Sequence, residues 1–315
     1  MTGHFDRDQS MAALKRALPY IRLYRDRIFV VKIGGAIGGD RAAVREVIEQ
    51  VSVLRELGVK VILVHGGGPQ TTALGERLGL AATVVEGRRV TDPETLEVAV
   101  MTINGTVNTA ILAVCRAANL PAVGLSGVDA GLVRATRRPP QVRDVNGEQV
   151  RVDYGLVGDI VAVDAAVLTR LLDAGLVPVV SPLSCDADGQ VLNINADTVA
   201  ATIAGETGAE KLILVTDTPG LLEDRQNPRS LISYTDVRGL GLLKERGAVE
   251  GGMLPKVEAA LAAIARGVKR VHMVGYRRSS LLVEVFTNEG AGTLIVKDAA
   301  ELPAAEHGGG EPAHD

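Results

Sequence analysis

The stretch Val61–Gln70 constrains the fold of this chain more than any other. Its apolar run Val61–Val64 is typical of a strand buried on both faces, and after His65 three glycines lead to Pro69. Proline suits the first turn of a helix, and glycines let the backbone approach a ligand closely. A strand that passes through glycines into a helix N-terminus predicts an anion site, although a tight turn without a ligand fits the same residues.

An earlier segment repeats this arrangement. The apolar run Ile28–Ile33 predicts a buried strand. Lys32 lies at its end, beside Gly34 and Gly35, and an apolar stripe at helical spacing over residues 44–57 leads to the next strand. We therefore expect an α/β fold with an open, mainly parallel sheet sandwiched by helices. Ligands bind at the carboxyl ends of strands in such sheets, so Lys32 is either a ligand-binding residue or a solvated lysine.

Two stretches break the alternation of strands and helices and predict β-hairpin excursions. Residues 131–161 are rich in arginine and include Asn146-Gly147, the strongest short signal for a hairpin. A second turn signal, Asp188-Gly189, precedes another short apolar segment.

Three polar residues, Asn193, Asn195 and Asp197, alternate with Leu192 and Ile194. A strand would place the three on one side, at the junction with a following helix. The pattern predicts a binding site, and a structural turn in which Asp197 caps the helix is compatible with it.

Further basic residues lie next to predicted helix starts. Arg88 and Arg89 come just before a helix that Asp92 and Pro93 begin, where they are either a clamp for a carboxylate or a solvated pair. Lys256 follows a glycine pair just inside another helix. A cation is locally unfavourable there, so we expect an anion nearby.

Composition and charge exclude several classes of function. The 315 residues include 34 Lys+Arg and 38 Asp+Glu, and a net charge of −4 predicts no partner among nucleic acids or anionic membranes. The two cysteines, Cys115 and Cys185, lie far apart and form no metal-ligand spacing. No apolar run of membrane-spanning length and no secretory signal are visible, so we expect a reduced, cytoplasmic compartment.

The candidate residues together favour phosphoryl transfer. The sequence contains no Gly-x-x-x-x-Gly-Lys-Ser/Thr motif, no protein-kinase catalytic loop and no Gly-x-Ser-x-Gly of an esterase. Lys32 and Lys256, together with glycine N–H groups and Mg²⁺, would offset the repulsion between an anionic acceptor and a polyphosphate. A carboxylate acceptor is already a nucleophile and needs no general base.

The chain resembles the amino acid kinase family over residues 14–298. The motifs that carry the resemblance are Val31–Gly35, Val64–Gln70, Gly87–Thr91, Asn193–Asp197 and Gly251–Val257. They are similar to those of the branch that uses ATP and Mg²⁺ to phosphorylate the γ-carboxylate of N-acetyl-L-glutamate, the second step of arginine biosynthesis. The resemblance implies the fold of this family and that activity.

The resemblance also implies roles for single residues. Lys32 and Lys256 would stabilise the transferring phosphoryl group, and Asp197 would orient the two lysines. The residues implied to bind the substrate are Gly67, Gly68, Arg89, Asn193 and Asn195, with Arg89 on the α-carboxylate. The residues implied to bind the nucleotide are Gly34, Gly35, Thr216 and Asp217.

Four regions follow from the same resemblance and from composition. They are an N-terminal helix that joins subunits (1–27), an N-lobe for substrate (28–185), a C-lobe for ATP (186–298) and a glycine-containing, disordered tail (299–315).

The N-terminal helix, which we expect Pro19 to interrupt, is similar to that of hexameric members of the family. We therefore expect a homo-oligomer, a hexamer built as a trimer of dimers. The positions implied to shape a site for arginine as a feedback inhibitor are Tyr20, Lys211, His272, Glu284 and Gly292.

Two alternatives stay open. One is a related kinase that acts on aminoadipate or glutamate attached to a carrier protein, for which the arginines of residues 134–151 would suit a protein-borne substrate. The Asn193–Asp197 strand and the N-terminal helix argue against it. The other is a catalytically idle arginine sensor, and the presence of both Lys32 and Lys256 argues against that.

Overall fold

The computed structural model describes residues 7–298, except for 82, 86, 87, 146, 147, 225, 228, 248, 250, 278, 279, 288 and 289. The predicted disordered tail 299–315 and the predicted turn Asn146-Gly147 lie outside the described residues. Within these limits the chain forms a mixed α/β structure around one large sheet.

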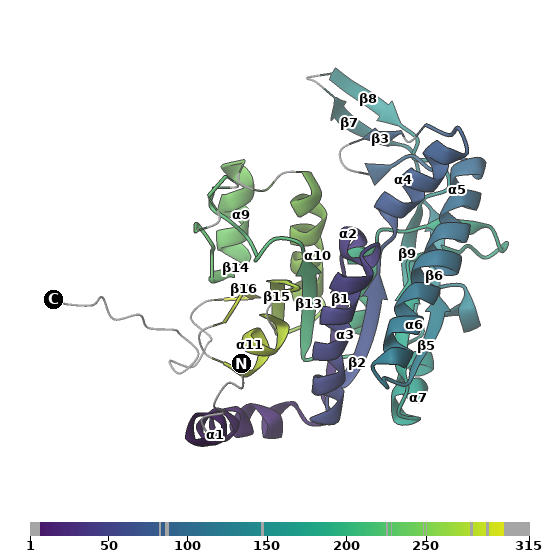
Figure 1. Cartoon of the computed structure of the whole chain (residues 1–315). Coiled ribbons are helices and arrows are strands. Elements are labelled where there is room, and N and C mark those ends of the chain that lie inside the picture. Colours follow the sequence, from purple (N-terminus) through teal and green to yellow (C-terminus); the bar gives the residue numbers. More distant parts are fainter. Residues whose placement is uncertain are drawn as a thin grey trace.

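The centre of the molecule is an eight-stranded sheet (Figure 1). All of its neighbouring strands pair in parallel, except β15 with β16. In order across the sheet, the strands are β14 (Tyr234–Asp236), β16 (Thr293–Val296), β15 (Arg270–Gly275), β13 (Lys211–Thr216), β1 (Ile28–Ile33), β2 (Lys60–His65), β10 (Val177–Ser181) and β5 (Ala122–Ser126). The predicted open, mainly parallel sheet is confirmed, with one antiparallel step near an edge.

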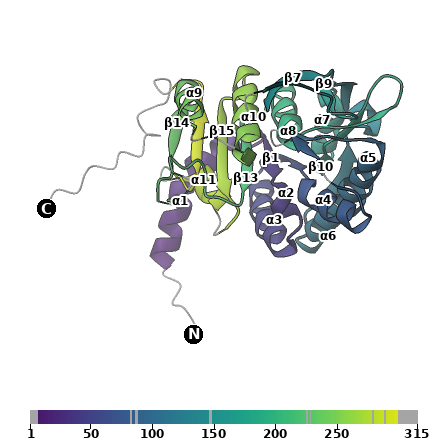
Figure 2. The same cartoon turned by 90° about the horizontal axis from the view of Figure 1, so that it is seen from above.

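Side chains of the central strands alternate between two helical layers. In β1, Phe29, Val31 and Ile33 are buried in one layer and Val30 in the other. The first layer contains α3 (Arg41–Glu56), α6 (Thr109–Ala117) and α11 (Ser280–Phe286), and the second contains α7 (Ala165–Asp173), α8 (Ala196–Glu206) and α10 (Leu254–Ala265). Figure 2 shows α3 and α6 on one side of β1 and β10, and α8 and α10 on the other. Strands with apolar residues on both faces require such two-sided cover.

The predicted hairpin excursions lie beside this sheet. A four-stranded sheet has the order β12 (Val191–Asn193), β11 (Leu183–Cys185), β6 (Val133–Arg137) and β9 (Gly158–Val163). Two separate antiparallel pairs are β3 (Val84–Val85) with β4 (Arg88–Arg89), and β7 (Gln141–Val145) with β8 (Glu148–Val152). The β7–β8 and β11–β12 pairs confirm both predicted hairpins, and β7–β8 projects from one end of the molecule (Figure 1).

The remaining elements include short helices that follow strands. They are α2 (Gly35–Gly38), α4 (Gly68–Arg77), η2 (Asp129–Gly131) and α9 (Val237–Glu245), and the short η3 (Gly251–Met253) follows α9. Pro69 occupies the first turn of α4, as its position after the glycines predicts.

A π-helical segment interrupts the helix that Asp92 caps. The helix consists of α5 (Pro93–Val100), the π-helix η1 (Met101–Asn108) and α6. It is also the one helix, within the described part of the chain, that is long and apolar enough to cross a membrane by length and composition alone. This corrects the expectation that no such run exists. Half of its apolar 18-residue window is buried inside the protein, and residues of α6 pack in the core on one face of the sheet.

The N-terminal helix α1 (Arg7–Tyr24) passes through Pro19 without a break, so the predicted interruption is wrong. Pro19 lies on the exposed side, where water can hydrogen-bond the carbonyl that loses its partner. Tyr24 is buried against Phe29, with ring centroids 5.2 Å apart, and fixes the end of α1 to the sheet.

Candidate active site

Two adjoining cavities lie at the carboxyl ends of β1, β2 and β13. The first, of about 280 Å³, is lined among others by Lys32, Gly35, residues 66–68, Arg89 and residues 193–197. The second, of about 450 Å³, is lined by residues 34–37, 216–218, 220–222, 252–253 and Lys256. Gly35 lines both cavities, so they meet there. Every residue predicted for catalysis, substrate or nucleotide binding lines one of the two cavities.

Lys32 and Asp197 form a buried ion pair in the first cavity. Lys32 Nζ lies 2.7 Å from Asp197 Oδ1, and the two side chains are 5% and 7% exposed. Lys32 comes from the end of β1, and Asp197 from the first turn of α8, where the helix dipole favours a carboxylate. Two residues far apart in sequence thus place opposite charges at the same edge of the sheet.

Asn195, not Asp197, caps helix α8. Asn195 Oδ1 accepts hydrogen bonds from the N–H groups of Asp197 (2.8 Å) and Thr198 (3.1 Å). The alternative that Asp197 serves as the cap is therefore wrong, and its carboxylate is available to Lys32. Both residue types favour caps, so the sequence alone does not separate them. Asn193 precedes the helix and its Nδ2 donates to Thr91 Oγ1 (3.3 Å).

The glycines are required where the β2 loop meets the α2 segment. A Cβ atom on Gly35 would lie 2.9 Å from Pro69 Cδ and within 3.7 Å of the backbone nitrogens of Gly67 and Gly68. A Cβ atom on Gly67 would lie 2.8 Å from Ile103 Cγ1. Real Cβ contacts are not this short, so a side chain at Gly35 would push the two loops apart and one at Gly67 would displace Ile103 of η1.

Arg89 is held against the glycine loop. Its Nη2 donates to the Gly68 carbonyl (3.0 Å) and to Thr72 Oγ1 (2.5 Å). Burial lowers the pKa of its guanidinium from the ordinary value, although an arginine stays charged at neutral pH. A fixed guanidinium in the lining of the first cavity suits a carboxylate. The side chain of Arg88 lies outside the described residues.

Lys256 lies at the second cavity, in the first turn of α10. Its Nζ donates to the Gly252 carbonyl (2.8 Å). Burial lowers the pKa of Lys256, the carboxylate of Asp197 opposes this, and the charge of Lys32 adds to the lowering. The charges of both members of the Lys32–Asp197 ion pair thus act on Lys256 from the adjoining cavity. Asp217, at the end of β13, also raises this pKa.

The remaining predicted nucleotide residues form the wall opposite Lys256. Gly34 N–H donates to the Val215 carbonyl (3.1 Å), which ties the loop after β1 to β13. Thr216 Oγ1 donates to the Thr218 carbonyl (2.5 Å) and reaches the Val274 carbonyl (3.3 Å). Among the described residues no group of three or more His, Cys, Asp or Glu could hold a metal ion.

Two residues of the first cavity, Arg138 and Ile103, are not predicted as site residues from the sequence, where Arg138 appears only among the arginines of residues 134–151. Arg138 Nη2 lies 2.6 Å from Asp159 Oδ1, and its guanidinium lies over the ring of Tyr154, 5.8 Å from the centroid. Only the pairing of β6 with β9 brings it to the cavity. Ile103 belongs to η1 and supports Gly67, and no periodicity predicts a π-helix.

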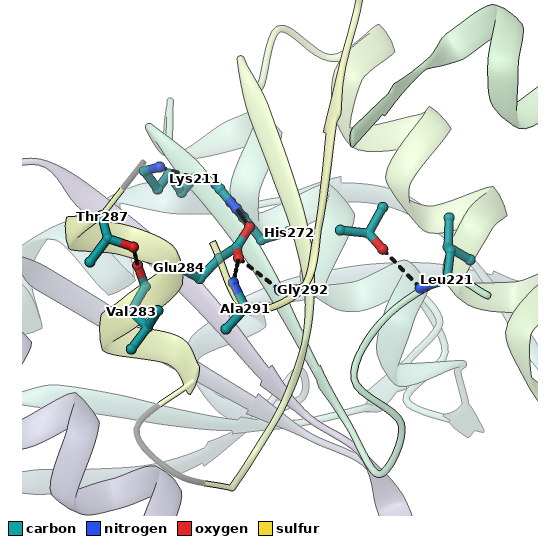
Figure 3. Close-up of polar contacts among 9 residues, drawn as sticks. Lys211, Leu221, His272, Val283, Glu284, Thr287, Ala291 and Gly292 are labelled. Carbon is teal, nitrogen blue, oxygen red and sulfur yellow. Dashed lines mark hydrogen bonds and ion pairs between the residues drawn. The ribbon is translucent and has the colours of Figure 1, made fainter. Parts of the chain in front are cut away.

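A second buried cluster lies on β13, β15 and α11 (Figure 3). Lys211 Nζ is 3.0 Å from His272 Nε2, and His272 Nδ1 is 2.8 Å from Glu284 Oε1. Glu284 Oε2 accepts the backbone N–H of Gly292 (2.9 Å). Tyr20 stacks on Tyr24, whose ring lies beside Lys211 of this cluster. The structure thus brings together four of the five residues implied to form an inhibitor site.

The histidine of this cluster is neutral. An ammonium group can only donate, so Lys211 donates to Nε2 and Nδ1–H donates to Glu284. Burial, and then the charge of Lys211, lower the pKa of His272 to about 4. Burial raises the pKa of Glu284, but hydrogen bonds from His272 and two backbone N–H groups outweigh it, and the net shift is downward.

Comparison with known proteins agrees with this geometry. Residues 27–275 match the model of the amino acid kinase family. The chain is 45% identical to acetylglutamate kinase from Myxococcus xanthus over 300 residues, which cover 94% of this chain and 97% of that one. It is 44% identical to acetylglutamate kinase from Symbiobacterium thermophilum over 287 residues, 91% of this chain and 97% of that one.

A solved structure extends the comparison. N-acetylglutamate synthase from Neisseria gonorrhoeae, complexed with coenzyme A and N-acetyl-glutamate, superposes with a TM-score of 0.78 at 27% identity, covering 92% of this chain. This chain spans only 64% of that synthase. The same synthase with coenzyme A and L-arginine gives a TM-score of 0.76 at 25% identity, covering 92% of this chain and 66% of that one. With its family match over most of its length and its near full-length relatives, the chain belongs to the amino acid kinase family.

Proposed function

We propose that the protein transfers a phosphoryl group from ATP to the γ-carboxylate of N-acetyl-L-glutamate and forms N-acetyl-L-glutamyl 5-phosphate in arginine biosynthesis. The observation that carries the proposal is a buried Lys32–Asp197 ion pair in the first cavity and Lys256 in the second, with the two cavities adjoining at Gly35. The names of the relatives at 45% and 44% identity support the choice of substrate. Both relatives align over nearly their whole length.

The first cavity is the proposed substrate site. Arg89 would bind the α-carboxylate, and Asn193 and Asn195 would hold the rest of the substrate beside the N–H groups of Gly67 and Gly68. The γ-carboxylate then faces Lys32. Because a carboxylate is already a nucleophile, no side chain has to remove a proton from it.

The second cavity is the proposed site of ATP. Its glycines, Gly34 and Gly35, leave room for phosphates beside the backbone, and Thr216 and Asp217 would line the side of the nucleotide. Lys256 and Lys32 neutralise charge on the transferring group from two sides, and Asp197 keeps Lys32 in place.

Mg²⁺ fits this site when the phosphates of the nucleotide coordinate it. Asp197 is already paired with Lys32, and the described residues contain no larger carboxylate cluster. Mg²⁺ commonly keeps several waters and binds through phosphates. When bound, it would neutralise phosphate charge.

The experiment is a coupled assay of ADP release with free N-acetyl-L-glutamate as the acceptor. We expect turnover with the free compound and far less with glutamate or aminoadipate on a carrier protein. A protein that turns over only the carrier-linked substrate would be the related kinase instead. The absence of any turnover would leave only the idle arginine sensor.

We further propose that the second cluster binds arginine as a feedback inhibitor. Lys211 and Glu284 offer opposite charges that match the carboxylate and the guanidinium of arginine. The synthase solved with L-arginine supports the idea. Adding arginine to the assay should lower the rate in the wild type but not in Glu284→Gln. Equal inhibition of both proteins would contradict this assignment.

The assembly and the compartment are also proposals. Met11 and Leu18 of α1 are exposed, at 53% and 39%, and would be covered if α1 joins dimers into a cytoplasmic hexamer. Light scattering should give a hexamer for the whole chain and a dimer after deletion of residues 1–25. An unchanged mass would contradict it.

A further inference from the structure

The proposed mechanism leaves the buried residue His65 without a role. It is the last residue of β2, directly before the glycine loop, and its side chain is fully buried. Burial lowers its pKa to about 4, so the ring is neutral at physiological pH. A neutral imidazole has one donor and one acceptor nitrogen, and both have partners here.

The partners of the ring select one tautomer. Asn108 Nδ2 lies 2.9 Å from His65 Nε2 and 3.1 Å from the Val179 carbonyl. A carbonyl can only accept, so the Val179 contact identifies the NH₂ group of the amide as the group facing the ring. Nε2 is therefore the acceptor. The proton resides on Nδ1, which lies 3.0 Å from the Gly66 carbonyl and donates to it.

The Gly66 carbonyl controls the direction of the next N–H. A trans peptide is planar, so its C=O and N–H point in opposite directions. When His65 holds the Gly66 carbonyl inside the protein, the N–H of Gly67 must point the other way. That nitrogen lies 3.7 Å from where a Cβ of Gly35 would be, at the meeting point of the two cavities.

Nothing in the loop itself prevents this peptide from turning over. Gly66 and Gly67 both lack a side chain, and glycine adopts either sign of φ with little cost. The ring of His65 thus supplies a constraint that the loop sequence lacks. The π-helix η1 completes it, since it carries Asn108 at its end and packs Ile103 against Gly67. Gly124 leaves the space for the Asn108 amide, because a Cβ there would touch Asn108 Oδ1.

We infer that His65, held in its Nδ1–H tautomer by Asn108, is a positioning residue for phosphoryl transfer that aims the Gly67 N–H into the cleft. The inference rests on the proposed function. It also gives the π-helix a role, which is to present Asn108 to the ring. π-Helical turns occur often at functional sites.

The direct test reads the tautomer in the intact wild-type protein. Long-range ¹H–¹⁵N NMR of a ¹⁵N-histidine sample should show Nδ1 protonated for His65, with no titration between pH 5.5 and 8. His65→Gln, in which this signal is missing, assigns it among the five histidines. A protonated Nε2, or a titration in this range, would overturn the inference whether or not the protein phosphorylates N-acetyl-L-glutamate.

The kinetic test compares side chains that replace one ring nitrogen at a time. His65→Asn keeps an N–H donor near the position of Nδ1, His65→Gln reaches only the position of Nε2, and His65→Leu supplies neither. We expect kcat to fall about 10- to 100-fold in His65→Leu and His65→Gln and several-fold less in His65→Asn. Asn108→Leu should fall between them, because the ring keeps its donor but loses the partner that selects the tautomer.

Ile111→Val, one turn further along the same buried helix, is the matched control and should keep the wild-type kcat. Equal kcat values in the wild type and in folded His65→Leu would overturn the inference. So would equal losses in His65→Asn and His65→Leu, because a donor at Nδ1 would then have no effect. The wild-type rate decides the proposed function before any variant is compared.

Discussion

Two buried lysines lie on neighbouring strands of one sheet but at opposite ends of it. Lys32 is near the end of β1, opposite Leu214 in the register, whereas Lys211 begins β13, opposite Phe29. Their exposures are 4% and 3%, so burial does not distinguish them. What differs is the surroundings. Lys32 lines the first of two adjoining cavities with glycine walls, whereas Lys211 lines neither of them.

The partners of the two lysines differ as well. Lys32 pairs directly with the carboxylate of Asp197, whereas Lys211 contacts the neutral ring of His272, which in turn contacts Glu284. The comparison indicates that a buried lysine is a candidate catalytic residue when it lies at the carboxyl ends of the strands and lines a cavity. At the opposite end the same residue type forms part of a buried hydrogen-bonded network with His272 and Glu284.

The largest effect should come from Lys32→Met. We expect kcat/KM to fall by about 10³-fold or more, because a charge that acts on the transferring group is lost. The free energy of unfolding should also fall by about 3 to 5 kcal/mol, since Asp197 is left buried without its partner. Lys60→Met removes a half-exposed ion pair with Asp173 and should leave the rate unchanged. A Lys32→Met enzyme with wild-type kcat/KM would contradict a role for Lys32 in phosphoryl transfer.

Lys256→Met should separate catalysis from stability. The rate should fall by about 10²-fold, but unfolding should change by only about 1 kcal/mol, because the partner of Lys256 is a backbone carbonyl near the surface. Steady-state kinetics and urea denaturation of both lysine variants measure the two quantities. If Lys256→Met lost as much stability as Lys32→Met, the two lysines would not differ in the way described.

Arg89→Lys tests whether the geometry of the guanidinium or its positive charge binds the substrate. Lysine keeps the charge but cannot hold Gly68 and Thr72 while presenting further donors to a carboxylate. We expect the KM for N-acetyl-L-glutamate to rise about tenfold and the KM for ATP to stay within about twofold. An increase in the KM for ATP alone would contradict the assignment of Arg89 to the substrate site.

The last effect is one that both regions share. His65 and His272 each have a pKa of about 4 in the folded protein, against 6.5 for a free side chain. The unfolded chain therefore binds protons first as the pH falls, so stability is complete above pH 6.5 and is lost toward pH 4. Urea denaturation between pH 7 and 4.5 should show a shallower loss in His65→Asn than in the wild type. Parallel pH profiles would contradict the burial of a neutral ring at His65.

Much of the fold could be predicted because β-branched runs and glycine turns are local signals. The strand over residues 28–33, the glycine turn after His65 and the cap at Asp92 all lie where the sequence predicts them. The continuity of α1 through Pro19 could not be predicted, because it depends on which side of the helix meets water. Nor could the π-helix, whose apolar residues suit an α-helix equally well.

The candidate site depended on contacts between distant segments. Periodicity placed Lys32 at a strand end and Asp197 at a helix start, but their 2.7 Å contact follows only from the three-dimensional fold. Asn195 is the cap because the helix begins at Ala196, which places Asp197 inside the first turn. Arg138 reached the cavity through strand pairing that no single segment encodes.

The most direct test of the central claim is to trap the product. An acyl phosphate formed at the γ-carboxylate reacts with hydroxylamine, so incubation with ATP and N-acetyl-L-glutamate should yield a hydroxamate in step with ADP. We expect a high yield of hydroxamate from the wild type and from Lys60→Met, and almost none from Lys32→Met or Lys256→Met. Release of ADP without hydroxamate, or equal yields from the wild type and Lys32→Met, would contradict it.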